Sequence, residues 1–209
     1  STSTNIFTFS YGTENASRPP LIFIHGAGGT HLHWPPQVRR LSGQRIFALD
    51  LPGHGKSGGV GCQSIADYAR TVVDFLDANH MNTAIFIGHS MGSAIALTLA
   101  LDFPKRVLGL GLVGSGARLR VAPQILEDTA GESTFPAAVK LINEWAFGAS
   151  SNPRLKELAA QRMAEIRPSV IHGDFLACNE FDVLGRLGEI AVPALILCGA
   201  DDRLTPVKY

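Results

Sequence analysis

The stretch AIFIGHSMGSAIALTLAL, residues 84–101, decides the fold. Residues 84–88 form a short apolar run typical of a strand buried on both faces, and residues 91–101 are apolar nearly all round, which predicts a fully buried helix. Between them, Gly88-His89-Ser90-Met91-Gly92 fits G-x-S-x-G, a pattern that needs a strand–turn–helix setting. Ser90 is therefore a candidate nucleophile on a strained turn that glycines permit. The alternative is a serine that only caps a helix.

Further apolar runs flank this stretch, at residues 6–11, 21–25, 45–50, 107–113 and 194–199. Buried strands that alternate with helices predict an α/β fold with a mainly parallel sheet and helices on both faces. One such helix opens at the capping box Ser64-Ile65-Ala66-Asp67.

The region from about residue 116 to 189 breaks this alternation. It shows no strand pattern and predicts helices at residues 137–147, 154–166 and 169–187. Ligands of parallel sheets bind at the carboxyl ends of the strands, so we interpret this region as a helical cap over that edge. The predicted division is an amino-terminal core at 1–115, a cap at 116–190 and the start of a second core part at 191–209.

A glycine-rich turn, His25-Gly26-Ala27-Gly28-Gly29, follows the predicted strand at residues 21–25. A carbonyl attacked by a serine becomes an oxyanion and needs backbone N–H donors, one of them from the residue after the nucleophile. Ala27 and Met91 are the predicted donors. A glycine-rich turn without such a role is the alternative.

These two motifs and Asp50-Leu51-Pro52-Gly53-His54-Gly55-Lys56-Ser57 stand in an order that resembles the α/β-hydrolase superfamily. The resemblance covers essentially the whole chain, and the segment at residues 50–57 is its most specific part. It implies a Ser-His-Asp/Glu triad and hydrolysis of an ester or related bond, usually without a cofactor. Serine at position 90 disfavours the dehalogenase and epoxide-hydrolase branches, for which the resemblance implies a carboxylate nucleophile.

The resemblance places the acid of the triad in Gly199-Ala200-Asp201-Asp202-Arg203-Leu204-Thr205-Pro206. The family spacing Gly-x-x-Asp-x-x-x-Pro selects Asp202, and Asp201 then forms the turn. Asp201 stays open as the alternative acid.

The base of the triad has no candidate after the acid, because all seven histidines precede Asp202. His172, in the predicted cap, is the best placed of them to reach Ser90. In this fold the histidine follows the acid, past one more helix and strand. We therefore expect a longer natural protein whose carboxyl-terminal strand and helix are absent here, and no esterase activity above background in these 209 residues. A naturally non-catalytic homologue is the second interpretation.

The substrate is predicted least well. Gly28 and His33 on the oxyanion-loop side, and Trp145 and Phe175 in the predicted cap, are the candidate substrate-binding residues. The oxyanion loop carries no cluster of charges, which favours a neutral, moderately apolar ester. A small-molecule binding or receptor protein, a C–C bond hydrolase and an acyltransferase stay open as alternatives.

The amino-acid composition argues against several other classes of protein. The 209 residues carry 18 basic and 18 acidic side chains, which argues against a nucleic-acid or polybasic membrane surface. No apolar run approaches the roughly 20 residues that span a bilayer. Three cysteines without metal-ligand spacing predict neither a disulfide framework nor a metal site, and favour a reducing, cytoplasmic compartment. A homodimer stays open.

Overall fold

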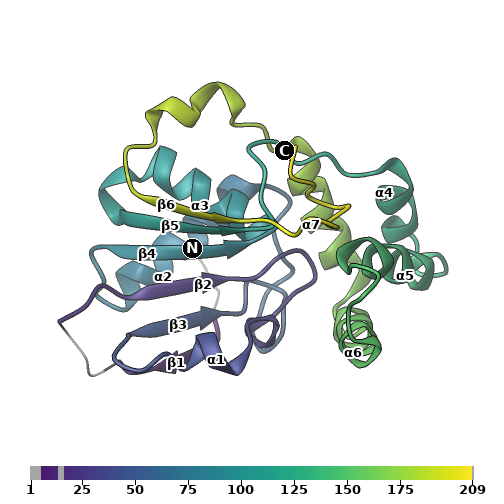
Figure 1. The fold of residues 1–209 in the computed structure, drawn as a ribbon, viewed down its shortest axis with the longest axis horizontal. Coiled ribbons are helices and arrows are strands. Elements are labelled where there is room, and N and C mark those ends of the chain that lie inside the picture. The colour runs from purple at the N-terminus through teal and green to yellow at the C-terminus, as the bar shows by residue number, and fades with distance from the viewer. Residues whose placement is uncertain (1–5, 14–16, 209) are drawn as a thin grey trace.

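The computed structural model describes residues 6–13 and 17–208. The sequence of the first four residues shows neither an initiating Met nor a signal-peptide pattern, and these residues lie outside the described ranges. A single sheet runs in the order β1-β3-β2-β4-β5-β6 (Figure 1). Its strands are β1 (Thr8–Tyr11), β2 (Leu21–Ile24), β3 (Ile46–Leu49), β4 (Ala84–His89), β5 (Val107–Val113) and β6 (Ala194–Leu197). Only β1 pairs antiparallel, with β3, and the other pairs are parallel. The predicted α/β-hydrolase architecture is confirmed.

Both faces of the central strand β2 are covered, and its successive side chains, which point to opposite sides, join two different clusters. On one face, Ile22 and Ile24 join a large apolar core with α2 (Ile65–Ala78) and α3 (Met91–Asp102). On the other, Phe23 packs edge-on against Trp34, next to the short helices η1 (His31–His33) and α1 (Pro36–Arg39). This two-sided burial holds the strand ends, and hence the loops that follow them, in fixed positions.

The last strand differs from the prediction. We expected residues 194–199 to be a buried strand, but in β6 Leu195, Ile196 and Leu197 are 63%, 64% and 52% exposed. The reason is its place at the edge of the sheet. It pairs only with β5, and its apolar side chains have no helix packed over them among the described residues.

Between β5 and β6 the chain forms four α-helices, α4 (Pro123–Ala130), α5 (Phe135–Ala146), α6 (Pro153–Ala164) and α7 (Pro168–Glu180), and a 3-10 helix, η3 (Leu184–Glu189). Helices α4–α7 lie beyond the carboxyl ends of the strands, at the right of Figure 1. They share an apolar cluster of their own, built around Ile125, Ile142 and Phe175. The placement agrees with the predicted cap, whose boundaries stay a prediction.

Two details of this segment were not predicted. Helix α4 is missing from the prediction, because its eight residues hold only two large apolar side chains. The helix predicted at 169–187 ends at Glu180, because the chain there becomes extended. Phe181 accepts a hydrogen bond from the Leu119 N–H, and Arg118 bridges Asp182.

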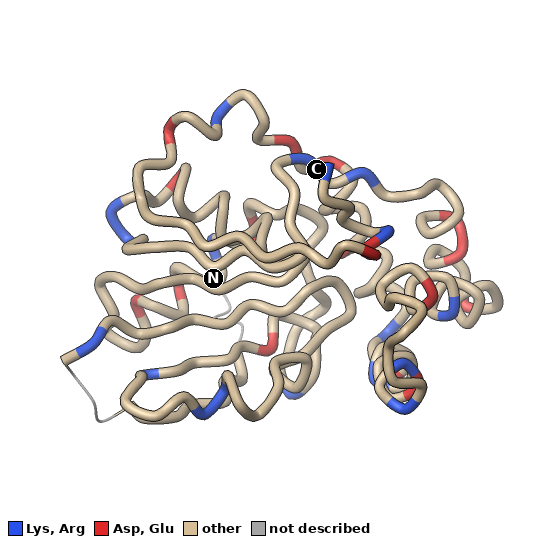
Figure 2. The backbone as a smooth tube through the Cα atoms, in the orientation of Figure 1, with Lys and Arg blue, Asp and Glu red and all other residues tan. Residues whose placement is uncertain are grey.

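Charged residues of both signs are scattered along the backbone, and the strands of the sheet are almost free of them (Figure 2). Within residues 6–13 and 17–208, no helix is both long and apolar enough to cross a membrane.

Candidate active site

Ser90 occupies the sharp turn between β4 and α3. Its backbone has φ 53° and ψ −116°, in the left-handed half of the φ range that a residue with a side chain seldom adopts. The glycines on either side allow the helix to fold back this tightly. A Cβ at Gly88 would lie 2.1 Å from the Gly92 carbonyl oxygen, and a Cβ at Gly92 would lie 2.1 Å from the Ile24 carbonyl oxygen. The predicted strand–turn–helix setting is present.

The glycine-rich loop after β2 passes directly against this turn. A Cβ at Gly26 would lie 3.2 Å from the Ser90 Cβ. The N–H groups of Gly28 and Gly29 are already used, since Gly28 donates to Asp174 Oδ2 at 2.9 Å and Gly29 to the Gly26 carbonyl at 3.0 Å. Among the described residues the Ala27 N–H has no partner. Of the loop's last three N–H groups, Ala27 therefore has the one that is free for a ligand at Ser90.

Met91 is the first residue of α3, so its N–H is one of the first-turn groups that no carbonyl of the same helix can reach. The amino-terminal end of α3 also carries the positive end of the helix dipole. Both features favour a negative charge beside Ser90.

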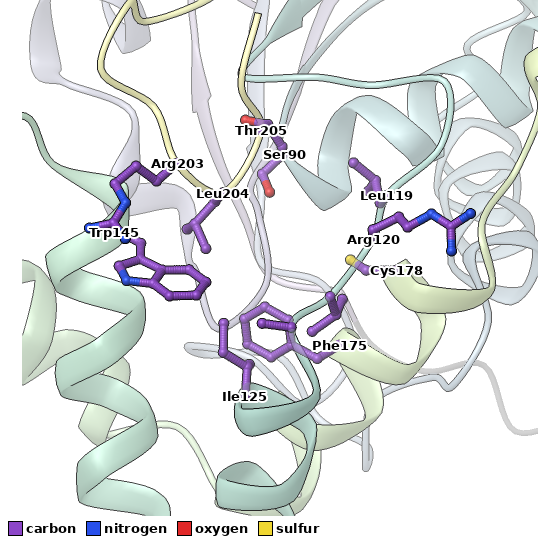
Figure 3. A pocket seen from close by; sticks show the side chains of 12 residues that line it. Ser90, Leu119, Arg120, Ile125, Trp145, Phe175, Cys178, Arg203, Leu204 and Thr205 are labelled. Carbon is purple, nitrogen blue, oxygen red and sulfur yellow. The ribbon is translucent and has the colours of Figure 1, made fainter. Parts of the chain in front are cut away.

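A cavity of about 230 Å³ opens at Ser90 (Figure 3). The serine hydroxyl points into it, and the guanidinium of Arg203 lies over the Trp145 ring, with its Cζ 5.1 Å from the ring centre. Most of the wall is apolar. The full lining is Ser90, Leu119, Arg120, Val121, Ala122, Ile125, Trp145, Phe175, Cys178, Arg203, Leu204 and Thr205.

Two of the four predicted substrate-binding residues, Trp145 and Phe175, line this cavity, and the other two do not. Gly28 instead packs against Ile171. The ring of His33 accepts a hydrogen bond from the Thr30 N–H at 3.1 Å and thereby caps η1. These two residues have local roles that the sequence pattern did not reveal.

Asp202 is half-buried just after β6. Its Oδ1 accepts the N–H groups of Leu204 and Thr205, each at 2.9 Å, and its Oδ2 accepts the Thr205 hydroxyl at 2.9 Å. A Cβ at Gly114 would lie 3.4 Å from Asp202 Oδ2 and 3.6 Å from the ring of His89. The carboxylate therefore faces the end of the sheet where Ser90 lies.

Asp201 faces elsewhere. A Cβ at Gly148, beyond the end of α5, would lie 2.9 Å from Asp201 Oδ2. Neither Asp201 nor Asp202 lines the cavity at Ser90, so the two carboxylates differ in their contacts and not in access to that cavity. The turn-forming role that we predicted for Asp201 belongs to Asp202, because Asp202 accepts the turn's N–H groups. This geometry agrees with the preference for Asp202 as the acid.

None of the seven histidines, all of them among the described residues, forms a hydrogen bond with the Ser90 hydroxyl. His172, the best-placed candidate from the sequence, bonds Thr129 at 3.0 Å and does not line the cavity. His25 accepts the Leu51 N–H at 3.0 Å, and burial holds the pKa of its ring well below the ordinary value. Within residues 6–13 and 17–208 the structure therefore shows no histidine placed as the base for Ser90.

Several cavity residues were missed in the sequence. Leu119 and Cys178 belong to no motif, and they reach the cavity only because the loop after β5 and helix α7 converge there, where Thr205 of the turn after β6 also lies. Arg203 and Leu204 directly follow the predicted acid, and that position was the available signal for them.

A family model described as the alpha/beta hydrolase fold matches residues 19–209. The chain belongs to this family. It is 32% identical over 199 residues to a protein of Variovorax paradoxus named as a carbamate hydrolase, with 89% of this chain and 75% of the relative aligned. It is 29% identical over 215 residues to a pimeloyl-[acyl-carrier protein] methyl ester esterase of Pectobacterium carotovorum, covering 96% of this chain and 83% of the relative.

Solved structures agree with the family. One described as a thermophilic esterase is 33% identical, with a TM-score of 0.81 over 98% of this chain and 77% of that chain. These three relatives are named as hydrolases or esterases, which supports hydrolysis of an ester-like bond as the activity of the family.

Proposed function

We propose that this protein is a serine hydrolase that cleaves a neutral, moderately apolar ester through a covalent acyl-enzyme. The observation that carries the proposal is the strained Ser90 turn, which sets a hydroxyl at a mainly apolar cavity with Gly26 of the glycine-rich loop packed against it. Relatives named as esterases support the ester bond.

In the proposed reaction, Ser90 Oγ attacks the ester carbonyl while a base takes the hydroxyl proton. The oxyanion is held by the N–H groups of Ala27 and Met91. Collapse breaks the C–O bond, and the alcohol leaves with the proton that the base returns. Water then attacks the acyl-Ser90 ester and releases the acid.

The base in this proposal is a histidine that is not among the seven of this chain, and Asp202 orients it. The four helices α4–α7 act as a cap that holds the substrate against Trp145 and Phe175. We also propose that this chain alone has no esterase activity above background.

The test is hydrolysis of p-nitrophenyl esters of graded acyl length, with and without added imidazole as an external base. Wild type and Ser90→Ala are compared at equal imidazole, so that direct hydrolysis by imidazole cancels. We expect a Ser90-dependent rate only with imidazole, highest for acyl chains of intermediate length. Binding of the same esters without any Ser90-dependent rate would favour the receptor alternative, and robust turnover without imidazole would mean that a histidine of this chain is the base.

A further inference from the structure

Asp174, on α7, is completely buried and accepts hydrogen bonds from three separate segments of the chain. Its Oδ2 accepts the Gly28 N–H at 2.9 Å and faces His54 Nε2 at 2.8 Å. Its Oδ1 accepts the Tyr68 hydroxyl at 2.6 Å. A helix of the proposed cap therefore reaches into the core and binds the glycine-rich loop that runs past Ser90.

The partner of this carboxylate is a charged histidine. His54 Nδ1 faces the Pro52 carbonyl oxygen at 3.0 Å, and His54 Nε2 faces Asp174, so both ring nitrogens meet acceptors and both must carry a proton. Burial, the largest single effect, lowers the pKa of His54. The charge and hydrogen bond of Asp174, the Pro52 carbonyl and the Asp50 charge together outweigh it and raise the pKa above the ordinary value. A buried ion pair holds Asp174 in one position, since either charge alone would be costly there.

The hydrogen bond from Gly28 to Asp174 lies close to the proposed nucleophile Ser90 in the fold. Gly28 has φ 63°, a left-handed conformation that turns the chain between Ala27 and Gly29. Two residues earlier, Gly26 packs against Ser90. The orientation of the Ala27 peptide thus depends on a loop that is fixed at one end by the Ser90 turn and at the other by Asp174.

We propose that Asp174 is a positioning residue, which holds the loop at residues 26–29 so that the Ala27 N–H is aimed at the oxyanion. The inference rests on the proposed function. The bond from the Gly28 N–H to Asp174 thus couples the docking of helix α7 to the assembly of the oxyanion hole.

The experiment compares Asp174→Asn with Tyr68→Phe in the imidazole-supplemented ester assay. Both variants disturb the same buried cluster, but Tyr68→Phe removes the donor to Oδ1 and leaves Gly28 and His54 bound to Oδ2. We expect Asp174→Asn to lower kcat by about 10- to 100-fold with KM changed less than about threefold, because a misdirected oxyanion donor weakens only the transition state. Tyr68→Phe should stay within about threefold of wild type in both constants.

A readout independent of activity is the Gly28 amide in NMR spectra. In wild type we expect it to be shifted downfield and protected from exchange, and in Asp174→Asn to lose both properties. Should Asp174→Asn fail to fold, Gly28→Ala disturbs the same loop while it leaves the His54–Asp174 pair intact. We expect Gly28→Ala to show the same loss of kcat.

The outcomes separate the two proposals. If only Ser90→Ala is inactive, and Asp174→Asn and Gly28→Ala both keep the wild-type kcat, the positioning role is wrong and the proposed function stands. An equal loss of kcat in Tyr68→Phe would show a general structural effect and would also overturn the inference. If wild type and Ser90→Ala hydrolyse at the same rate, the proposed function fails, and the positioning role fails with it.

Discussion

The close approach of α3 to β2 predicts how much Gly92→Ala lowers the free energy of unfolding. A Cβ at this position would lie 2.1 Å from the Ile24 carbonyl oxygen and 2.7 Å from that of His25. Both atoms belong to the backbone, so no side chain can rotate away, and α3 would have to move by about 1 Å in a close-packed core.

The magnitude follows from two opposing effects. Alanine in place of glycine in a helix gains up to about 1 kcal/mol. Overpacking typically costs about 1–3 kcal/mol and more when it is backbone that must shift. We expect the clash to win, with a net loss of about 3 kcal/mol or more in the free energy of unfolding, a large part of the roughly 5–15 kcal/mol of a typical protein.

Gly109→Ala is the matched control, since it is also a buried glycine next to the sheet's backbone. Its Cβ would lie 3.4 Å from the Pro193 carbonyl oxygen, an ordinary contact. Urea unfolding followed by circular dichroism should place Gly109→Ala within about 1 kcal/mol of wild type. If Gly92→Ala is as stable as Gly109→Ala, the packing of the Ser90 turn is not as described.

Three further predictions concern single side chains. In the imidazole-supplemented ester assay, Asp202→Asn should lower the Ser90-dependent rate by at least about tenfold and Asp201→Asn by less than about twofold, and the reverse order would make Asp201 the acid. Trp145→Ala should raise KM for apolar esters by about tenfold with a smaller change in kcat, and an unchanged KM would remove the ring from the binding site. Burial, then His89 and Arg162, lower the pKa of His33 to about 4, so its contribution to stability is present above pH 6.5 and is lost as the pH falls through 4. Between pH 7 and 4 wild type should therefore lose about 1–3 kcal/mol more than His33→Asn, measured by urea unfolding, whereas equal losses would contradict the lowered pKa.

Most of the sheet could be predicted from the sequence, because apolar runs such as residues 84–88 carry a strong local signal. The burial of β6 could not, since the run at residues 194–197 looks the same at an edge as in the middle of a sheet. Helix α4 was missed because its two apolar positions are too few for a periodic pattern.

Some residues of the candidate site could likewise be predicted from the sequence, and others could not. Ser90, Ala27 and Met91 lie in short motifs whose geometry depends on neighbouring residues, so the sequence indicates them directly. Asp174 belongs to no motif, and its partners Gly28 and Tyr68 lie 146 and 106 residues away in the chain. A contact of that kind appears only once the fold is known.

In the proposed mechanism Ser90 is the nucleophile, and its base is none of the seven histidines of this chain. The most direct measurement is the rate of p-nitrophenyl ester hydrolysis by wild type minus that by Ser90→Ala, as a function of imidazole concentration. We predict a difference near zero without imidazole that rises with imidazole and saturates. A zero difference at every concentration, or a full difference without imidazole, would contradict the claim.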